Sequence, residues 1–348
     1  MNLGPVFHIV RRFEPKGGME TYVWKLTHAL QDLGVDIRVI CEMADNSSAV
    51  PYLLVNGSKQ RRRWKSMRDF RSAVREYVEG MNLPLGTIVH SHERTDIHQV
   101  TTIHGPLIGR IENQSLFKRL TSQRVRFWCE AEFDEICGSN VKAVLPVSDL
   151  SLREILNTYP EVSNSFVESA PPGLDEGHSE IFKPAATPLR IVFAGREWKR
   201  KGLPLAIEIC RQLNLAGLKS QLDVFGVPLQ KMYGGLSWLS FKGEVDAIPF
   251  GDYDLLVHPA RSEPYGMVIA EALVAGCRVL TSDRVGATML KHPMMCALGL
   301  QENVGLWVAA AQNLALCSGF VEYSFPTWMN LAEYHCDTVY PRVVNTRP

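Results

Sequence analysis

LLVHPARSEPYGMVIAEALVAGCRVLT occupies Leu255–Thr281 and predicts a strand, a loop, a helix and a second strand. Leu255–Val257 and Arg278–Thr281 are short, largely apolar runs of the kind that forms buried parallel strands. Between them a helical pattern begins after Gly266 and ends at Gly276, and glycine is common just past the end of a helix. Two parallel strands joined by a helix form a βαβ unit.

The same alternation of short strands and longer helical patterns extends over the whole chain. It predicts an α/β protein with parallel sheets covered by helices on both faces. A segment rich in Pro, Gly and Ser, Glu168–Pro188, separates two such halves. We therefore expect two doubly wound, Rossmann-like domains facing each other across a ligand-binding cleft. The other expected strands are Val6–Val10, Asp36–Ile40, Thr87–Val89, Val100–Ile103, Val141–Val147, Leu189–Phe193 and Leu222–Phe225.

The composition limits the classes of protein to consider. The 348 residues are 46% hydrophobic, and 37 Lys and Arg balance 37 Asp and Glu, which gives no indication of a nucleic-acid partner. Residues 1–130 nevertheless contain 19 basic and 13 acidic side chains, so this half is expected to face something anionic. Eight cysteines without a C-x-x-C pair, and apolar runs too short for a signal peptide or a membrane span, predict a cytosolic protein.

Two loops place glycine immediately before a helix. Gly17 and Gly18 precede a helix expected from about Met19 to Leu33, and free backbone N–H groups there favour an anion, although such a turn is structural about as often. In the second loop, Arg196 and Lys201 are expected beside a helix N-terminus, where cations oppose the helix dipole unless an anion lies between them. A bound diphosphate would resolve that conflict. The alternative is a solvated loop, with the neighbouring Lys199 and Arg200 as surface charge.

Two carboxylates mark the opening segment. Glu263 follows an expected strand and so lies at the carboxyl edge of its sheet, and Glu271 lies about one and a half turns inside the following helix. A helix in a sheet protein rarely buries carboxylates without partners. We therefore expect Glu271 to accept hydrogen bonds from ribose hydroxyls and Glu263 from a sugar ring.

Four histidines, His90, His92, His98 and His104, lie close together in the sequence and raise the hypothesis of a zinc site. No cysteine or acid completes a ligand set, and the expected strands separate the four residues. We expect no metal, and we expect His92 to line the cleft or to be hydrogen-bonded.

Ser58–Met81 predicts an amphipathic basic helix with apolar residues at helical spacing. It can pack its apolar stripe on the sheet, and it can also present its basic face to anionic lipid. A second basic patch with Phe127 and Trp128 strengthens the lipid hypothesis. The basic residues of the helix are Lys59, Arg61, Arg62, Arg63, Lys65, Arg68, Arg71 and Arg75, and those of the second patch are Lys118, Arg119, Arg124 and Arg126.

Several motifs occur together in one order: the Gly17-Gly18 pair, TTIHG at Thr101–Gly105, FAGREWKRKG at Phe193–Gly202, and the Glu263/Glu271 pair. This set resembles the family-4 retaining glycosyltransferases of GT-B fold, and the likeness extends to FPTWMNLAEYHCDTVY, which is similar to the family's terminal helix. The resemblance implies an N-terminal acceptor-side domain at 1–168, a linker at 169–188, a C-terminal nucleotide-sugar domain at 189–325 and a helix at 326–348 that crosses back to the first domain.

The resemblance also implies roles for single residues. His104 would lie beside the donor sugar and assist the reacting centre, and Glu263 would contact the transferred sugar near its 3-hydroxyl. Donor binding would involve the side chains of Arg196, Lys201 and Glu271, the close backbone approach of Gly17 and Gly18, and the backbone N–H groups of Tyr265, Gly266, Met267 and Val268. No metal and no cofactor are implied.

The function that follows is transfer of a hexose from a nucleotide-sugar to a surface glycan, lipopolysaccharide or glycolipid acceptor. A UDP-sugar is favoured over GDP-mannose by the family's usual donors. Two alternatives stay open: a nucleotide-sugar epimerase or hydrolase of the same fold, and a two-domain solute-binding protein. The expected location is the cytoplasm, with peripheral association at the inner face of the cytoplasmic membrane through Arg61, Arg62, Arg63 and Lys65.

Overall fold

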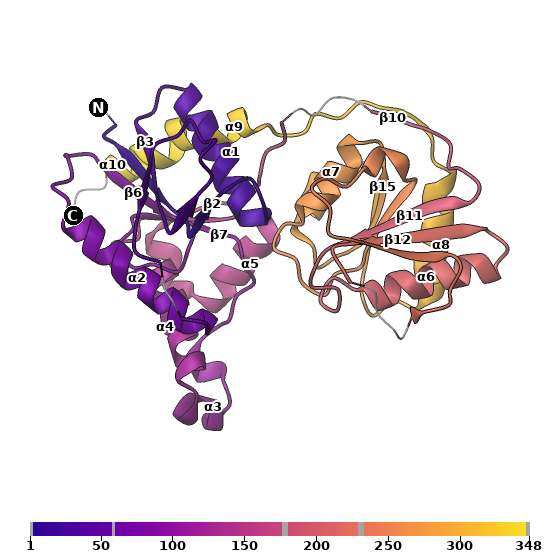
Figure 1. Ribbon diagram of the computed structural model, residues 1–348, viewed down its shortest axis with the longest axis horizontal. Helices are drawn as coiled ribbons and strands as arrows, with labels where there is room; N and C mark the ends of the chain where they lie inside the picture. Colours follow the sequence, from indigo (N-terminus) through magenta and orange to yellow (C-terminus); the bar gives the residue numbers. More distant parts are fainter. Residues whose placement is uncertain (1–2, 58–59, 176–179, 229–232, 346–348) are drawn as a thin grey trace. The chain divides into compact units, whose positions relative to one another are not determined.

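The computed structural model describes residues 3–57, 60–175, 180–228 and 233–345, and the chain divides into two compact units (Figure 1). The first unit contains Met1–Gly173 and Pro326–Pro348, and the second contains Leu174–Phe325. Parts of three predicted features lie outside the described residues: the start of the basic helix with Lys59, residues 176–179 of the linker, and residues 346–348 of the terminal segment.

The first unit is built on a seven-stranded parallel sheet. Its inner strands β1, β6, β7 and β8 are buried along their whole length, which explains why they appear in the sequence as short apolar runs. In spatial order the strands are β5 (Tyr52–Leu54), β3 (Ile37–Cys41), β1 (Val6–Ile9), β6 (Ile88–Ser91), β7 (Val100–Ile103), β8 (Ala143–Pro146) and β9 (Phe166–Val167).

Helices cover the sheet of the first unit (Figure 1). The segment after Pro326 returns to this unit, where α9 packs against α1 and the ring of Trp328 meets the ring of Tyr22 edge to face at 5.6 Å. The helices are α1 (Gly18–Asp32), α2 (Arg63–Glu79), α3 (Leu116–Thr121), α4 (Gln123–Cys137), α5 (Asp149–Thr158), α9 (Trp328–Tyr334) and α10 (Tyr340–Asn345), with the short helices η1 (Ile111–Asn113) and η2 (Pro160–Asn164) and a π-helical turn, η6 (His335–Val339). Strands β2 (Arg12–Phe13) and β4 (Met43–Ala44) form a small separate pair.

The second unit is built on a six-stranded parallel sheet. In spatial order its strands are β13 (Leu239–Gly243), β12 (Ser220–Phe225), β11 (Leu189–Ala194), β14 (Leu255–His258), β15 (Arg278–Ser282) and β16 (Met295–Leu298). The helices are α6 (Leu203–Leu215), α7 (Met267–Val274) and α8 (Val304–Leu316), with η4 (Phe250–Asp252) and η5 (Gly286–Leu290), and β10 (Glu180–Phe182) pairs antiparallel with β17 (Gly319–Val321).

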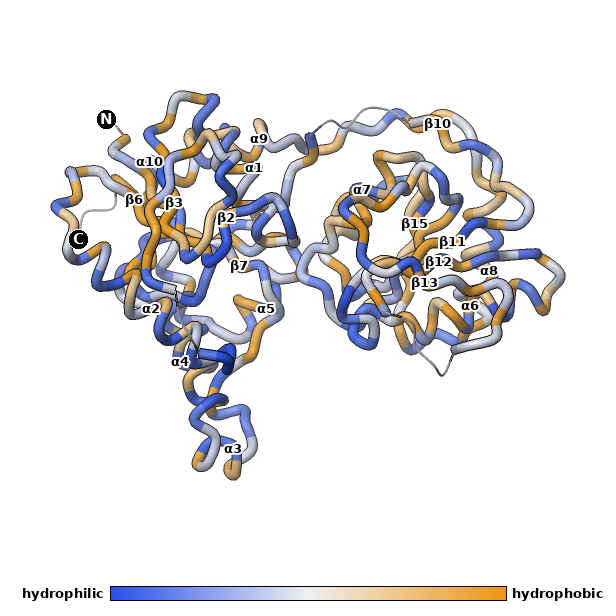
Figure 2. The backbone as a smooth tube through the Cα atoms, in the orientation of Figure 1, coloured by the Kyte–Doolittle hydropathy of each residue, from blue (hydrophilic) through white to orange (hydrophobic). Residues whose placement is uncertain are grey.

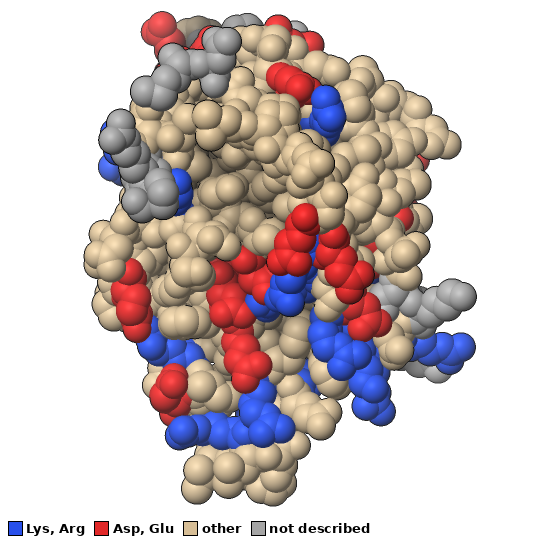
Figure 3. Space-filling view, turned by 90° about the vertical axis from the view of Figure 1, so that its left-hand side faces the viewer, with Lys and Arg blue, Asp and Glu red and all other residues tan. Residues whose placement is uncertain are grey.

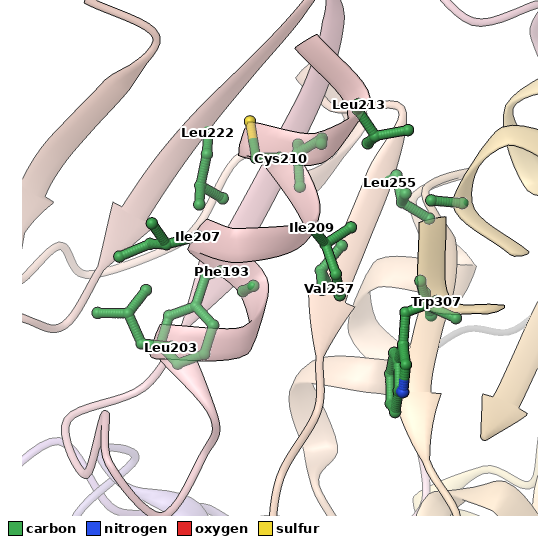
Figure 4. Packing of buried hydrophobic residues seen from close by; sticks show 14 of the residues in the cluster. Phe193, Leu203, Ile207, Ile209, Cys210, Leu213, Leu222, Leu255, Val257 and Trp307 are labelled. Carbon is green, nitrogen blue, oxygen red and sulfur yellow. The ribbon is translucent and has the colours of Figure 1, made fainter. Parts of the chain in front are cut away.

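The core of the second unit lies between its sheet and helices α6 and α8. Phe193, Leu222 and Val257 from the strands meet Ile209 from α6 and Trp307 from α8, and all five are fully buried (Figure 4). Each buried side chain of this size stabilises the fold by roughly 1.5–3 kcal/mol relative to exposure. The hydropathy colouring shows the same pattern in both units, with the most hydrophobic residues concentrated on the strands (Figure 2).

Every strand expected from the sequence is present, and the α/β class with parallel sheets is confirmed. Strands β5, β9, β13 and β16 were not predicted; all four lie at or near sheet edges and are only partly buried. None of the helices in the described ranges combines the length and the apolar character that a membrane crossing needs.

Candidate active site

The loops after β11 and β14 meet at one edge of the second sheet, because the two strands are parallel neighbours. Lys201 follows β11 and Glu263 follows β14, and Lys201 Nζ lies 3.2 Å from Glu263 Oε2. Arg200 Nη1 lies 3.2 Å from the same oxygen and also donates to the backbone carbonyl of Ser262. The structure therefore brings Lys201 and Glu263 together, and it adds Arg200, which the sequence offered only as surface charge.

Glu263 is an ionised carboxylate in a largely buried position. Burial alone would raise its pKa, but the neighbouring cations Lys201 and Arg200 outweigh that effect, and the pKa of Glu263 is about 2. The fully buried His258 ring makes no normal hydrogen bond to this carboxylate, since its Nε2 is 3.8 Å from Glu263 Oε2. Burial lowers the pKa of His258, so its ring is neutral at neutral pH.

Backbone hydrogen bonds fix the position of Glu263. Its N–H donates to the carbonyl of Arg284 at 3.0 Å, and its carbonyl accepts from Gly286 N–H at 3.0 Å. Gly266 caps α7 with φ of 91°, a conformation that favours glycine, and a Cβ there would lie 3.2 Å from Glu263 Cγ. The N-terminus of α7 thus begins directly beside the Glu263 side chain.

The residues that begin α7 can bind an anion through their backbone. Tyr265 is 5% exposed, and its carbonyl accepts from Ala287 N–H at 2.8 Å, so the chain entering the helix is held in place. Met267 and Val268 are the first two residues of α7, and N–H groups of a first turn have no partner within their own helix. These groups and the helix dipole favour a negative charge at this point.

Glu271 lies one turn further along α7. Part of its surface is exposed to solvent. Desolvation by the surrounding protein raises the pKa of Glu271, and the positive charge of Lys201 partly opposes that rise. Glu271 is therefore available to a ligand at the edge where Glu263 and Lys201 lie.

Arg196 does not join the ion pairs around Glu263. Its guanidinium pairs with Glu244, at 3.0 Å between Nε and Oε1, and its side chain is 79% exposed. Exposed pairs of this kind contribute only about 0–1 kcal/mol. Arg196 is therefore free to exchange Glu244 for another anion at little cost.

In the first unit, Gly17 caps α1 and Gly18 is its first residue. Gly17 has φ of 107°, which favours glycine, and both glycines are exposed. The carboxylate of Glu20 lies where a Cβ of Gly17 would project, only 2.4 Å from that position. The glycines thus leave open backbone at the start of α1, with an acidic side chain beside it.

His104 follows β7 at the edge of the first sheet and is partly exposed. Its Nε2 lies 2.9 Å from Nδ1 of His92, and its ring meets the ring of Tyr22 edge to face at 4.7 Å. Desolvation lowers the pKa of His104 to about 3, so the ring is neutral at neutral pH. At neutral pH the His104 ring can therefore form hydrogen bonds but carries no positive charge.

The expectation that the strands separate the histidines is wrong for three of the four. His90, His92 and His104 gather with His8 of β1, because β1 and β6 are neighbouring strands in which His8 pairs with His90. Only His98 lies apart, bonded to the hydroxyl of Thr95 and the carbonyl of Glu135.

Within the described ranges, His8, His90 and His92 place one ring nitrogen each within 4.8 Å of one another. Their ring nitrogens are, however, already engaged in hydrogen bonds with one another, with His104, and with the hydroxyls of Tyr340 and Thr102. These hydrogen bonds involve both ring nitrogens of each of the three histidines.

A buried carboxylate holds the loop that follows His104. Glu132 of α4 is fully buried and accepts hydrogen bonds from the N–H groups of Ile108 and Gly109, each at 2.8 Å to the nearer oxygen. It also accepts from the hydroxyl of Tyr159 at 2.7 Å and from Arg94 at 2.8 Å. One side chain therefore fixes the backbone just beyond the histidine.

The basic helix α2 packs its apolar stripe, including Met67, Phe70 and Val74, in the core of the first unit. Arg61, Arg62 and Arg63 at its start are exposed, and Lys65 lies over the ring of Trp64 at 5.6 Å. Further along, Arg71 and Arg75 both pair with Asp96, so the positive charge is concentrated at the beginning of the helix.

The short helix α3 presents exposed apolar side chains beside basic ones. Leu116, Phe117 and Leu120 are 67%, 76% and 67% exposed, and Lys118 and Arg119 lie between them in the sequence. In the view of Figure 3, Lys and Arg side chains gather beside acidic ones over the lower half of the face, above an uncharged lower end. In Figure 1, α3 forms the lowest part of the first unit.

Several site residues were missed from the sequence. A signal for His8 was present, since pairing the first and third expected strands in register would have placed it beside His90. The sequence contained no comparable signal for Arg200 or Glu132, because the orientation of these side chains depends on loop and helix packing.

Two family models match the chain: Glycosyltransferase Family 4 over residues 16–178 and Glycosyl transferases group 1 over residues 188–316. Among solved structures, WaaG, a glycosyltransferase involved in lipopolysaccharide biosynthesis, is 17% identical over 97% of each chain, with a TM-score of 0.71. Sucrose-phosphate synthase from Thermosynechococcus elongatus is 16% identical over 98% of this chain and 94% of its own, with a TM-score of 0.66. HepE from Anabaena in complex with UDP and glucose is 12% identical over 98% and 97%, with a TM-score of 0.58. A search of curated proteins finds no match.

Proposed function

The chain belongs to glycosyltransferase family 4, and on that basis we propose that it transfers a hexose from a UDP-sugar to a glycan or glycolipid acceptor. It is a retaining glycosyltransferase, and its two parallel sheets match GT-B structures. Membership of this family excludes the solute-binding alternative.

The observation that carries the proposal is the pairing of Lys201 and Glu263 beside the N-terminus of α7. A nucleoside diphosphate leaving group gains negative charge as the glycosidic bond breaks. Lys201 and the first N–H groups of α7 would stabilise that charge, which is the usual means of lowering such a barrier. Arg196 would exchange Glu244 for the diphosphate when the donor binds.

The two carboxylates would bind the hydroxyls of the donor. The pKa of Glu263, held at about 2, keeps its oxygens as acceptors at neutral pH, suited to a sugar hydroxyl near the bond that breaks. Glu271, one turn further along α7, would accept from both ribose hydroxyls. The HepE structure, which contains UDP and glucose, supports a uridine donor.

The proposed roles in the first unit concern both the donor and the acceptor. Gly17 and Gly18 offer open backbone at the start of α1 to phosphate and acceptor. His104 offers a neutral ring nitrogen to the donor sugar. The domain limits in this proposal are 1–168 for the acceptor side, 169–188 for the linker, 189–325 for the donor side and 326–348 for the terminal helix.

We place the protein at the inner face of the cytoplasmic membrane. The exposed Arg61–Arg63 group and Lys65 would attract anionic lipid at about 1 kcal/mol per residue near the surface. Phe117 and Leu120 on α3 would enter the lipid interface next to their own basic neighbours. A lipid-linked acceptor explains why charge and exposed apolar surface occur together in this unit.

The proposal is tested by a thermal-shift panel of UDP, GDP and their sugar conjugates, followed by product analysis. Stabilisation by UDP and UDP-hexoses, with sugar transferred only when an acceptor glycan is added, supports it. Conversion of the donor at a useful rate without any acceptor would instead establish the epimerase or hydrolase alternative.

A further inference from the structure

His258 is the last residue of β14, and its ring is fully buried at the sheet edge where Glu263 and Lys201 lie. The ring is stacked on that of the buried Phe193, with 6.3 Å between the centroids and 22° between the planes. Neither ring nitrogen of His258 has a hydrogen-bond partner among the residues that the structure describes. Buried polar groups normally have such a partner, so this ring calls for a physical explanation.

His258 faces the carboxylate of Glu263 at a distance just too long for a hydrogen bond. Its Nε2 lies 3.8 Å from Glu263 Oε2, the oxygen that Lys201 and Arg200 already contact at 3.2 Å each. The His258 ring is neutral, because burial lowers its pKa. A neutral ring has one N–H group, and the negative charge of Oε2 favours that proton on Nε2. His258 therefore directs an unused donor at a carboxylate that two cations already bind.

The two cations differ in how firmly they are held. The Nε and Nη2 of Arg200 pair with Glu197 at 2.8 and 2.6 Å, and its Nη1 also donates to the carbonyl of Ser262. For the ammonium group of Lys201, Glu263 is the only partner among the described residues. Lysine carries its charge on a flexible four-carbon stem, so the ammonium can turn to another anion without a backbone movement. Lys201 is consequently the cation that can leave Glu263.

Departure of Lys201 leaves Glu263 with Arg200 as its remaining cation. The Glu263 side chain is largely buried, and a desolvated carboxylate that loses a charged partner is costly. The Nε2–H group of His258 can replace the lost contact, because shortening 3.8 Å to a normal length of about 2.9 Å needs a shift of only about 1 Å. This donor is neutral, so it stabilises the carboxylate without adding a positive charge.

We propose that His258 is a positioning residue that donates a hydrogen bond from Nε2 to Glu263 when the diphosphate of the donor draws Lys201 away. The hydrogen bond keeps Glu263 in place for the sugar while Lys201 binds the leaving group. This exchange rests on the proposed function, in which Lys201 binds the diphosphate. The response of His258 to loss of the Lys201 ammonium does not rest on it, and it can be measured without a nucleotide.

The first test is a two-bond 1H–15N correlation spectrum of the full chain with 15N-labelled histidine, recorded at neutral pH without nucleotide. Wild type is compared with Lys201→Met, which removes the ammonium and keeps a long side chain, and His258→Phe identifies the signals of His258. We expect the Nε2–H form in both proteins, with the Nε2 proton shifted downfield in Lys201→Met because the hydrogen bond to Glu263 forms. An Nδ1–H form in Lys201→Met, or an Nε2 proton whose signal does not move, would overturn the proposal.

Two controls restrict the effect to the ammonium of Lys201. Lys199→Met changes an exposed lysine of the same loop and should leave the His258 signals as in wild type. His292 is a buried histidine of the same unit whose ring is stacked on Phe325, and its signals should be equal in wild type and Lys201→Met. Lys201→Gln, judged by the same signals, replaces Lys201→Met if that variant does not fold.

The second test is calorimetric titration of UDP into wild type, His258→Phe, Lys201→Met and the double variant. A charge-assisted hydrogen bond that forms only in the complex predicts at least about 10-fold weaker UDP binding by His258→Phe. Adding His258→Phe to Lys201→Met should cause no further loss, because no ammonium is left to be drawn away. His258→Gln keeps a side-chain N–H donor and should recover part of the affinity. Equal losses in both backgrounds would show that His258 acts only through packing and would overturn the proposal.

Failure of this inference and failure of the proposed function give different results. A downfield shift in Lys201→Met together with no binding of UDP refutes the donor site and supports the response of His258. Binding of UDP by wild type together with an unchanged His258 signal in Lys201→Met refutes the role of His258 alone.

Discussion

Lys201 and Glu263 form an ion pair between the ends of two neighbouring parallel strands, with 3.2 Å between Nζ and Oε2. The two side chains are only 16% and 13% exposed, and Arg200 contacts the same carboxylate oxygen. A partly buried pair is costly to leave half-formed, because the remaining charge stays desolvated. In the proposed function, the same cation would bind the diphosphate and the same anion the sugar of one donor molecule.

Lys201→Ala is expected to lower kcat/KM for sugar transfer at least about 100-fold, because a cation that stabilises the leaving diphosphate is lost. Lys199→Ala is the matched control, since Lys199 is exposed two residues earlier in the same loop and lies over the Trp198 ring. Steady-state kinetics on both variants, with circular dichroism to verify folding, measure the difference. Equal activity of the two variants would remove Lys201 from the donor site.

Glu263 makes stability depend on pH in the acid range. Its pKa is about 2 in the folded protein against 4.5 ordinarily, so it stabilises the folded state above pH 4.5 and loses that contribution as the pH falls toward 2. The full contribution is about 3 kcal/mol, from about 1.4 kcal/mol per pKa unit. Urea unfolding at about pH 6, 4 and 3 should show wild type losing stability relative to Glu263→Gln.

The control for this pH series is Glu244→Gln, whose carboxylate is 65% exposed. The free energy of unfolding of Glu244→Gln should change with pH as that of wild type does. If the difference in free energy of unfolding between wild type and Glu263→Gln stays constant down to about pH 3, the charge environment assigned to Glu263 is wrong.

Glu132→Ala tests the support of the loop after His104. The substitution leaves the N–H groups of Ile108 and Gly109, the Tyr159 hydroxyl and Arg94 without their shared acceptor. Losing one partner of a buried ion pair costs about 3–5 kcal/mol, so the melting temperature should fall by several degrees. The control is Glu130→Ala, because Glu130 is exposed on the same helix, and this variant should have the melting temperature of wild type. Similar melting of both variants would contradict the assigned role.

Sequence alone predicted the inner strands, because buried strands leave largely continuous apolar runs, and it placed Glu263 and Lys201 in loops that follow two of them. That these two strands are neighbours came only from the structure. The edge strands β5 and β9 were not predicted, because two or three partly buried residues do not form a recognisable apolar run. Both Lys201 and Arg200 contact Glu263. The sequence could not show this, because the direction of each side chain depends on the backbone geometry of the loop. The histidine cluster required the strand register as well as the strand positions.

Membrane association is expected to depend on the start of α2. Replacing Arg61, Arg62 and Arg63 by Gln removes about 3 kcal/mol of attraction to anionic lipid and weakens partitioning about 100-fold. Co-sedimentation with liposomes containing phosphatidylglycerol, at low and high salt, measures this. The control replaces three exposed basic residues elsewhere, Arg153, Arg211 and Lys219. Undiminished binding of the Arg61–Arg63 variant would place the contact elsewhere.

We expect the exposed apolar side chains of α3 to contribute to membrane binding as well. Phe117→Ser with Leu120→Ser should reduce liposome binding even at high salt, where charge attraction is screened. Binding that depends on salt but not on these two residues would restrict the contact to electrostatics.

The most direct measurement is isothermal titration calorimetry of UDP with the full chain and with its Lys201→Ala variant. We predict saturable binding with one site per chain for wild type, and affinity reduced at least about 10-fold in the variant, from the loss of a cation to diphosphate contact of about 1.4 kcal/mol or more. Absence of binding by UDP, GDP and their sugar conjugates to wild type would contradict the account, as would binding that Lys201→Ala leaves unchanged.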